Sequence, residues 1–378
     1  MSNGSNVPYA SNSLVRPILC SFNPAAQSLS AETSQKISNI LSEQNENSIT
    51  IEPSKTNVPW FSTLQDCRRG IHWAEAERST KFFLENLHRL SHSTGAKMPK
   101  QLSMENGMKF ATKQDDLIET AVACTVFQHP NGNVARTALI AQSMLLLWLQ
   151  DGKSKSILKK GCISRAYVKK NQSFVSFVED ICAEDKVLGR KVVDGMLAFL
   201  HDRGPERAAK VRQFRTLKDY LNFRTGDIAR TYNFATIEFA RGIDITAKDK
   251  KLVQIFEDIA GNHTILVQDL YSFERERMAS EADPSIQLVN VVAVMHALLG
   301  MDSYATSMIV VRDMIIQTEV EAKQEYDRLR KREKLNAAQL SYVEGLFQFM
   351  AGHIYFSATA PRYGYMYCKT TVPRYLVR

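Results

Sequence analysis

Three carboxylates stand together at the front of a run that otherwise has the pattern of a buried helix. The run is TKQDDLIETAV, residues 112 to 122, and its acids are Asp115, Asp116 and Glu119. Because an α-helix turns about 100° per residue, Asp115 and Glu119 share one face and Asp116 lies beside them. Taken alone, such a cluster is more often a solvated helix surface than a binding site.

A second set of oxygen donors lies far downstream, in another long helical pattern. In ILVQDLYSFERERM, Gln268, Ser272 and Glu276 follow one another at a spacing of four residues. An amide carbonyl, a hydroxyl and a carboxylate therefore share one helix face. Hard divalent cations such as magnesium take oxygen ligands and hold substrate phosphates at the same time. Arg275 stands next to the last donor, where it could contact an anion held by the metal.

These two segments resemble the metal-binding motifs of the class I terpene synthases. DDLIE is similar to the aspartate-rich motif D-D-x-x-D/E, and QDLYSFERE is similar to the second motif, N/D-D-x-x-S-x-x-K/R-E. In YLNFRTGDIAR, Arg224 resembles the diphosphate-sensing arginine, Asp227 stands at the linker position, and Ile228 stands at the effector position, where the backbone carbonyl acts. In APRYG, Arg362 and Tyr363 resemble the family's Arg-Tyr pair. The motifs keep the family's order and cover about residues 60 to 370.

The resemblance implies an all-α, single-domain helical bundle around a central apolar cavity. It also implies a carbon-oxygen lyase that uses magnesium to ionise a prenyl diphosphate and then cyclises the carbocation, with three ions and several donors stabilising the leaving diphosphate. The implied metal ligands are Asp115 and Glu119 for two ions, and Gln268, Ser272 and Glu276 for the third. The implied donors to the diphosphate are Arg224, Arg275, Arg362 and Tyr363, while Asp116 is expected to pair with a sensing arginine.

One residue departs from the family pattern. The first ligand of the second motif is usually Asn or Asp, and here it is Gln268. The extra methylene moves the carbonyl about 1.5 Å farther from the backbone, a large displacement for an ion that prefers octahedral geometry. Either the helix sits slightly back or the third metal site is weaker. Asp269 is not expected to substitute, because its side chain is turned about 100° away.

A carbocation needs an apolar wall, and the helical pattern YVEGLFQFMAGHIYF offers one. Tyr342, Phe349 and Phe356 recur every seven residues, and an aromatic face stabilises a nearby cation by ~0.5 to 2 kcal/mol. Phe223, beside Arg224, is a further candidate for the substrate cavity. An ordinary core helix shows the same heptad spacing, so cavity wall and core both remain open.

Long helices must position these motifs, and the chain has the pattern for them. From about residue 60 apolar residues recur three and four apart, and alternating strand patterns are scarce, so residues 56–378 are predicted to form an all-helical domain. Residues 1–55, rich in Ser and Asn, are predicted to be a mostly disordered leader with one short helix near Ser34 to Glu43. The segment RMASEADPS is expected to be a mobile loop over the mouth of the cavity.

Composition narrows the class of protein. The six cysteines form no C-x-x-C pair and no zinc spacing, which indicates reduced thiols in a cytoplasmic protein. No signal peptide or membrane span is recognised. The excess of 48 lysines and arginines over 40 acids suits a charged small substrate as well as nucleic acid or a membrane surface. A monomer or homodimer that binds a prenyl diphosphate and no nucleic acid is expected.

Two other functions remain open beside cyclisation. Prenyl chain-elongating synthases share the fold and the metal chemistry, but they normally carry a second D-D-x-x-D motif, which is absent here. A non-enzymatic basic helical binding protein would use RLRKREK at 328 to 334, although the preceding acids favour a salt-bridged helix surface. The single α-type domain resembles fungal sesquiterpene cyclases, so farnesyl diphosphate is the expected substrate and a cyclic sesquiterpene or its alcohol the expected product.

Overall fold

Long helices make up nearly all of the computed structural model, which describes residues 31–42, 45–56, 58–93, 108–151, 172–202, 214–283, 286–360 and 363. The elements that precede the bundle are α2 (Ala31–Ser42), β1 (Ser48–Ile51), the 3₁₀ turn η2 (Pro53–Lys55) and β2 (Cys67–Gly70). The helices of the bundle are α3 (Trp73–Ser93), α4 (Met108–Gln128), α5 (Val134–Asp151), α8 (Gln172–Glu184), α9 (Lys186–Asp202), α11 (Leu217–Arg224), α12 (Arg230–Arg241), α13 (Ala247–Ala282), α14 (Val291–Leu299), α15 (Tyr304–Arg332) and α16 (Ala337–Thr359). The predicted all-α class is confirmed.

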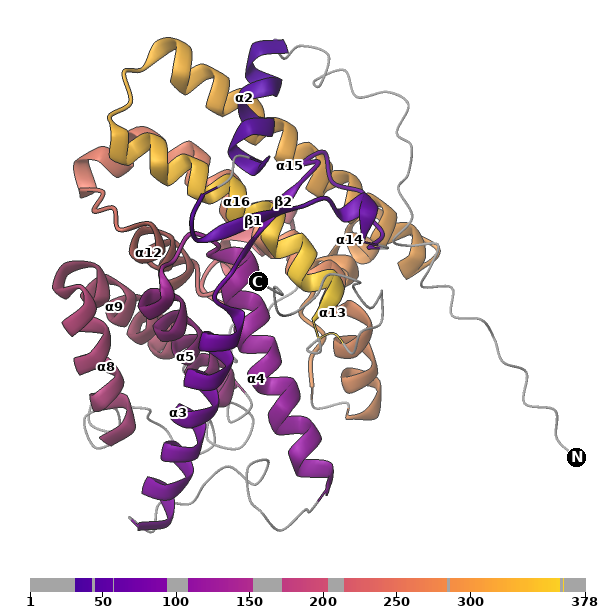
Figure 1. Cartoon of the computed structure of the whole chain (residues 1–378). Coiled ribbons are helices and arrows are strands. Elements are labelled where there is room, and N and C mark those ends of the chain that lie inside the picture. The colour runs from indigo at the N-terminus through magenta and orange to yellow at the C-terminus, as the bar shows by residue number, and fades with distance from the viewer. Residues whose placement is uncertain are drawn as a thin grey trace, which may run out of the picture.

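Helix α16 runs through the middle of the bundle (Figure 1). It packs against α4, α12 and α13, and α2 and β2 also contact it. Every residue from Gly345 to Ala360 is buried, as expected for a helix that is apolar on all sides. Among the described residues no single helix has the length and apolarity to cross a bilayer, and only α14 and α15 taken together, bent by 109°, reach that composition.

A glycine allows α16 to touch α4 directly. A Cβ atom at Gly352 would lie 1.8 Å from the backbone oxygen of Phe127, so any larger residue would force the two backbones apart. The backbones of the two helices therefore approach each other closely at the level of Gly352 and Phe127. His353 comes directly after Gly352, and Gln128 comes directly after Phe127, so both lie next to this contact.

Side-chain caps fix where the two helices that flank the site begin. Thr246 precedes α13, and its hydroxyl accepts a hydrogen bond from the Asp249 N–H at 3.1 Å. Asn336 precedes α16 and forms a capping box with Gln339. The Asn336 amide also donates to the Asp249 carboxylate at 3.3 Å. The starts of α13 and α16 are thus tied together.

A short β-ribbon, absent from the prediction, precedes the bundle. Strands β1 and β2 pair antiparallel, with Ser48 opposite Gly70 and Ile51 opposite Cys67. The pattern was not recognised because β2 reads CRRG, and its buried Arg68 reaches the Ser48 hydroxyl at 2.9 Å instead of alternating with apolar residues. The predicted short helix is present as α2, but residues 45–56 hold more regular structure than expected. Residues 1–30 lie outside the described ranges, so the division at residue 55 stays a prediction.

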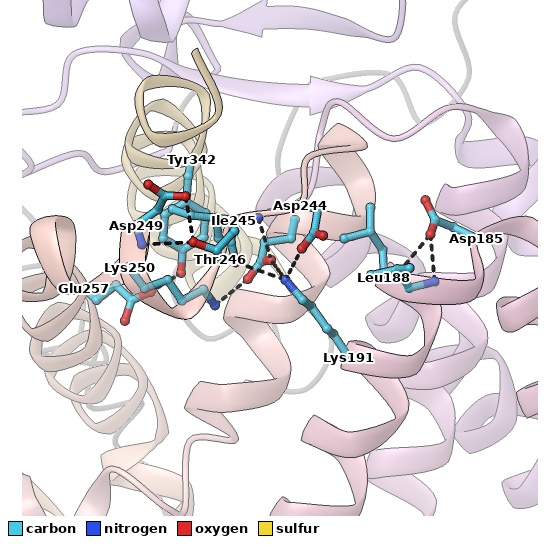
Figure 2. Close-up of polar contacts among 12 residues, drawn as sticks. Asp185, Leu188, Lys191, Asp244, Ile245, Thr246, Asp249, Lys250, Glu257 and Tyr342 are labelled. Carbon is cyan, nitrogen blue, oxygen red and sulfur yellow. Dashed lines mark hydrogen bonds and ion pairs between the residues drawn. The ribbon is translucent and has the colours of Figure 1, made fainter. Parts of the chain in front are cut away.

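An ion network joins α9, α12 and α13 (Figure 2). Glu238 of α12 is fully buried, accepts a hydrogen bond from Lys191 at 2.6 Å and forms an ion pair with Lys250. Lys191 also pairs with Asp244 at 2.6 Å. A buried carboxylate is tolerated where cations and hydrogen bonds compensate its lost hydration, so this junction holds the lysines and the helices that carry them in place.

Candidate active site

The acidic cluster lies where α4 leaves the core. Asp115 is exposed and Asp116 and Glu119 are half-buried, whereas every residue from Thr120 to Gln128 is buried. Helix α4 therefore carries its charges at the solvated end and its apolar residues at the packed end. The acids therefore stay hydrated, and their carboxylates are accessible to a ligand.

Helix α13 presents the second donor set in three different environments. Gln268 is half-buried and lines an internal pocket. Ser272 is 1% exposed, and its Oγ has no hydrogen-bond partner among the described residues. The Glu276 side chain is 27% exposed. A buried hydroxyl that lacks a partner has lost its hydration without compensation, so the Ser272 oxygen fits the role of a ligand to a cation.

The donors suit metal ions that are shared with a substrate. No group of three His, Cys, Asp or Glu side chains in the described ranges lies close enough together to hold an ion. Magnesium, however, usually retains waters and binds one or two carboxylates together with substrate phosphates. The acids of α4 and the mixed donors of α13 fit such incomplete sites, and they do not fit a closed metal cage made of protein alone.

Asp269 holds the predicted sensing arginine. Its Oδ1 accepts from Arg224 Nε at 3.1 Å and from Nη2 at 2.6 Å, and its Oδ2 accepts from the Tyr220 hydroxyl and from the Val291 N–H at 2.9 Å. Arg224 Nη1 donates to Asp227 at 3.2 Å. Burial acts to lower the pKa of Arg224, but Asp269 and the other acidic groups around it together outweigh burial and raise the pKa well above its ordinary value. Two of the five guanidinium N–H groups remain for a ligand.

No ion pair joins Asp116 to Arg224 among the described residues, and the pairing of Asp116 with a sensing arginine stays a prediction. Arg224 is reached instead by Asp269, whose side chain points about 100° away from that of Gln268 on the same helix. This orientation agrees with the expectation that Asp269 does not replace Gln268. A pairing of Asp116 with Arg362 lies outside the described residues, because Arg362 is not among them.

Asn290 connects Glu276 to Asp269. It is fully buried at the N-cap of α14, and its Oδ1 accepts from the Val292 N–H at 2.9 Å. Its Nδ2 donates to the Asp269 backbone oxygen at 2.9 Å and to Glu276 Oε2 at 3.1 Å. Burial raises the pKa of Glu276, while nearby Arg224 acts in the opposite direction. The hydrogen bond from Asn290 favours the charged carboxylate that a metal would require.

Arg275 contacts both Tyr363, which lines the pocket, and Glu276. The Arg275 guanidinium carbon is 5.7 Å from the centre of the Tyr363 ring, and its Nη2 is 3.7 Å from Glu276 Oε1. Tyr363 is buried, lines the pocket and packs edge-on against Phe356 at 6.0 Å. Two of the predicted diphosphate donors, one from α13 and one from the C-terminal segment, are thus brought together.

The pocket lies between α4, α5, α12, α13 and α16 and has a volume of about 80 Å³. Both polar and apolar side chains line it. Trp148 and Phe356 stack across it with ring centres 6.3 Å apart and planes inclined by 6°. The lining residues are Cys124, Gln128, Met144, Leu147, Trp148, Phe199, Asp227, Ile228, Ala229, Tyr232, Asn233, Thr264, Gln268, His353, Phe356 and Tyr363.

The break between α11 and α12 borders the same pocket. Ala229 adopts a left-handed conformation with φ of 52°, which costs about 1 kcal/mol or more for a residue other than glycine. The Ile228 carbonyl, predicted to be the effector group, accepts a hydrogen bond from Asn233 Nδ2 at 2.8 Å. Asp227, Ile228 and Asn233 all line the pocket. The linker and effector positions are therefore at the site, and Asn233 is an additional partner of the effector carbonyl.

Of the four predicted cavity aromatics, only Phe356 lines the pocket. Phe349 lies deeper, with its ring 5.6 Å from that of His129. The Tyr342 hydroxyl donates to Glu257 at 2.5 Å, among the charged side chains of the α12–α13 junction (Figure 2). Fourteen residues of helix separate Tyr342 from Phe356, about 21 Å, so the heptad stripe continues beyond the pocket into the core.

The fourth aromatic, Phe223, packs at 5.3 Å against Phe214, outside the pocket lining. Sequence reasoning also missed several residues of the site: Tyr220, Asn290, Gln128 and His353. Only Asn290 carries a local signal, because Asn directly before an apolar run indicates a helix N-cap. The others reach the site through tertiary packing.

Comparisons with known proteins show which family the chain resembles in sequence. Residues 189–321 match the family described as "Terpene synthase family 2, C-terminal metal binding". The chain is 25% identical over 373 residues to terpene cyclase 6 of Gibberella fujikuroi, covering 94% of this chain and 98% of that protein. It is 24% identical over 332 residues to terpene cyclase aneC of Aspergillus aculeatus, covering 84% of this chain and 74% of that protein.

Two further similarities bear on the fold and on the substrate. The crystal structure of aristolochene synthase from Penicillium roqueforti superposes with a TM-score of 0.60 at 17% identity, covering 78% of this chain and 96% of that one. A shorter match of 26% identity over 150 residues is to the bifunctional type I diterpene synthase tndC of Aspergillus flavipes, covering 40% of this chain and 20% of that protein. The relatives therefore include enzymes named for diterpenes.

Proposed function

The chain belongs to the class I terpene synthases, which depend on a divalent metal, and from this premise we propose that it ionises farnesyl diphosphate with magnesium. The carbocation is then closed to a cyclic sesquiterpene or sesquiterpene alcohol, and diphosphate is released. Ser272 carries the proposal: its buried, unpartnered hydroxyl stands between Gln268 at the pocket and Glu276, on the face where the second metal motif requires oxygen donors.

The residues at the site divide the work of ionisation. Bound magnesium would supply charge stabilisation to the departing diphosphate, with Asp115 and Glu119 holding two ions and the donors of α13 a third. The two N–H groups of Arg224 that Asp269 and Asp227 leave unused are available to the diphosphate. A preorganised donor stabilises the developing anion better than water does, because water must reorganise.

The part of the pocket lined by Trp148 and Phe356 suits the organic cation. Trp148 and Phe356 present stacked aromatic faces, each worth ~0.5 to 2 kcal/mol to a nearby cation. Ligand pockets for molecules of drug size have volumes of about 300–1,000 Å³, whereas this one has about 80 Å³. Binding of the prenyl chain therefore requires side chains that line the pocket to move apart. Once the chain is bound, the filled pocket excludes bulk water.

Pocket depth favours a fifteen-carbon substrate. Glu119 lies at the solvated end of α4, and Gln128, which lines the pocket, is nine residues farther along the helix, a distance of about 13 Å. The twelve-carbon main chain of a farnesyl group is about 14 Å long when extended. Geranylgeranyl diphosphate, the longer alternative, is kept as a candidate because some relatives are named as diterpene synthases.

Of the two alternative functions, one is excluded and one remains. A non-enzymatic binding protein is excluded by membership in an enzyme family, and the basic run is paired within its own helix, with Arg328 bonded to Glu325 at 2.7 Å and Lys331 to Asp327 at 2.6 Å. A chain-elongating synthase remains the alternative within the fold. It would consume isopentenyl diphosphate, and this requirement separates the two activities in an assay.

The test is incubation of purified protein with geranyl, farnesyl and geranylgeranyl diphosphates, with and without magnesium and isopentenyl diphosphate. Released diphosphate and the volatile products are measured. We expect magnesium-dependent cyclic product from farnesyl diphosphate, and loss of turnover in Asp115→Ala and Glu276→Ala at unchanged helical content. Glu281→Ala, an exposed acid later on α13 that pairs with Arg277, is the control and should stay active. If no diphosphate yields a magnesium-dependent product, the proposal fails.

A further inference from the structure

An imidazole without a hydrogen-bond partner lies at the floor of the pocket. His353 of α16 is 3% exposed and lines the pocket, and its Nδ1 has no hydrogen-bond partner in the part of the chain that the structure describes. Its ring packs against Phe356, at 6.4 Å and 20° inclination, and against Phe349 at 5.9 Å. Burial lowers the pKa of His353 to about 3. The ring is therefore neutral at physiological pH and keeps one nitrogen lone pair.

Gln128 lies at the same level as His353. The contact between Gly352 and the Phe127 backbone fixes α16 against α4, and the next residue on each helix lines the pocket. Gln128 is 5% exposed, and its amide makes no hydrogen bond to another described residue. Thr264 of α13 lines the same pocket, and its hydroxyl proton is engaged by the Ala260 carbonyl at 2.7 Å.

This floor has the properties of a water site. Buried polar groups are nearly always hydrogen-bonded to protein or to ordered water, and cavities that remain dry are apolar. A water molecule needs roughly 15 Å³ of such volume and two to four polar partners. The pocket has about 80 Å³, and the His353 ring, the Gln128 amide and the Thr264 hydroxyl oxygen offer the partners.

The acids of α4 that are expected to hold magnesium lie well away from Gln128. Along α4, Gln128 lies nine residues beyond Glu119, or about 13 Å. Proton transfer requires hydrogen-bond reach, about 3 Å or one intervening water. A proton lost from the distal end of the prenyl chain, or from a water that adds there, needs an acceptor within this reach, and the lone pair of His353 is one that lines the pocket.

We propose that His353 is a catalytic residue that, with Gln128, holds one water molecule against the distal part of the carbocation and accepts its proton, so that the product is a terpene alcohol. The water oxygen forms a bond to the cationic carbon, and one of its protons moves to the imidazole lone pair. The positive charge thereby passes from carbon to imidazolium. When the pocket opens to release the alcohol, the imidazolium returns its proton to bulk water. This inference rests on the proposed function.

The test is turnover of farnesyl diphosphate, or of whichever prenyl diphosphate reacts, in water enriched in ¹⁸O. We expect the wild-type alcohol to carry the label. In His353→Phe the ratio of alcohol to hydrocarbon should fall about 100-fold or more, the lower end of the range for a lost acid–base group, while the rate of diphosphate release changes much less. Gln128→Leu should shift the ratio in the same direction, which keeps the test valid if one variant fails to fold.

His129→Phe is the matched control. His129 is also a buried, neutral histidine, with its pKa lowered by burial to about 3, but it does not line this pocket. Its substitution should reduce stability and leave the product ratio unchanged. Unlabelled hydrocarbon as the only wild-type product would overturn the inference, as would an unchanged ratio in both His353→Phe and Gln128→Leu. Absence of magnesium-dependent diphosphate release would instead refute the proposed function itself.

Discussion

Replacing Asn290 by serine should weaken the metal site while leaving α14 capped. Serine retains an oxygen that can accept the Val292 N–H, but it loses the Nδ2 that donates to Glu276 at 3.1 Å and to the Asp269 carbonyl at 2.9 Å. A hydrogen bond to a charged group contributes about 1.5–3 kcal/mol, and one to a neutral group about 0.5–1.5 kcal/mol. Glu276 then loses its fixed orientation.

The expected result is a magnesium dependence shifted to higher concentration. Loss of a residue that orients a metal ligand typically costs 10–100-fold in affinity or activity, so the magnesium midpoint for diphosphate release should rise about tenfold or more in Asn290→Ser. A second readout needs no turnover: the thermal shift produced by magnesium with inorganic diphosphate should shrink. Asn290→Ala should show the same magnesium defect and lose a further ~1 kcal/mol of stability with the cap.

Asn336→Ser is the matched control, because Asn336 also caps a helix but contacts Asp249 instead of a metal ligand. It should keep the wild-type magnesium midpoint. The reasoning would be refuted if Asn290→Ser kept that midpoint too, or if Asn290→Ser and Asn336→Ser shifted it equally. In the first case Glu276 would be positioned by α13 alone, and in the second the shift would reflect general destabilisation.

Three further predictions follow from packing, ligand length and buried charge. Gly352→Ala should destabilise the protein by about 3 kcal/mol or more in urea unfolding, because its Cβ would meet the Phe127 backbone at 1.8 Å; a wild-type midpoint would contradict the contact. Gln268→Asn should keep activity within about tenfold because the carbonyl remains, whereas Gln268→Leu should lose more; equal activities would remove Gln268 from the metal ligands. Burial lowers the pKa of His129 from 6.5 to about 3, so between these pH values the unfolded chain binds more protons at this residue than the folded chain does. The free energy of unfolding should therefore fall by about 2 kcal/mol between pH 7 and pH 5 through His129. His129→Phe should be less sensitive to this pH change, as denaturant curves at the two pH values would show.

The helices and the donor spacing could be read from the sequence because both are local. A period of 3.6 residues fixes which side chains share a face whatever the helix packs against. This is why Gln268, Ser272 and Glu276 lie along one face of α13 in the structure, and why Asp115 and Glu119 lie at the solvated end of α4. The all-α class followed from the same periodicity repeated along the chain.

Periodicity does not tell how far along a face the ligand reaches. Phe356, Phe349 and Tyr342 look equivalent in the sequence, yet only Phe356 lines the pocket, because its floor lies between the levels of Phe356 and Phe349. That level depends on α4 and on Gly352, more than two hundred residues apart in the chain. The β-ribbon escaped recognition for a similar reason, since its buried Arg68 is satisfied by a partner on another strand.

The sequence by itself determined the class of helices, the two sets of oxygen donors and the resemblance that joined them, since each depends on residue types at fixed local spacing. Only the tertiary structure decided the partners: Asp269 for Arg224, Asn290 for Glu276, and an unpartnered His353 at the floor. These contacts join segments from separate helices, and their energies depend on burial. Burial is a property of the packed bundle and not of any one segment.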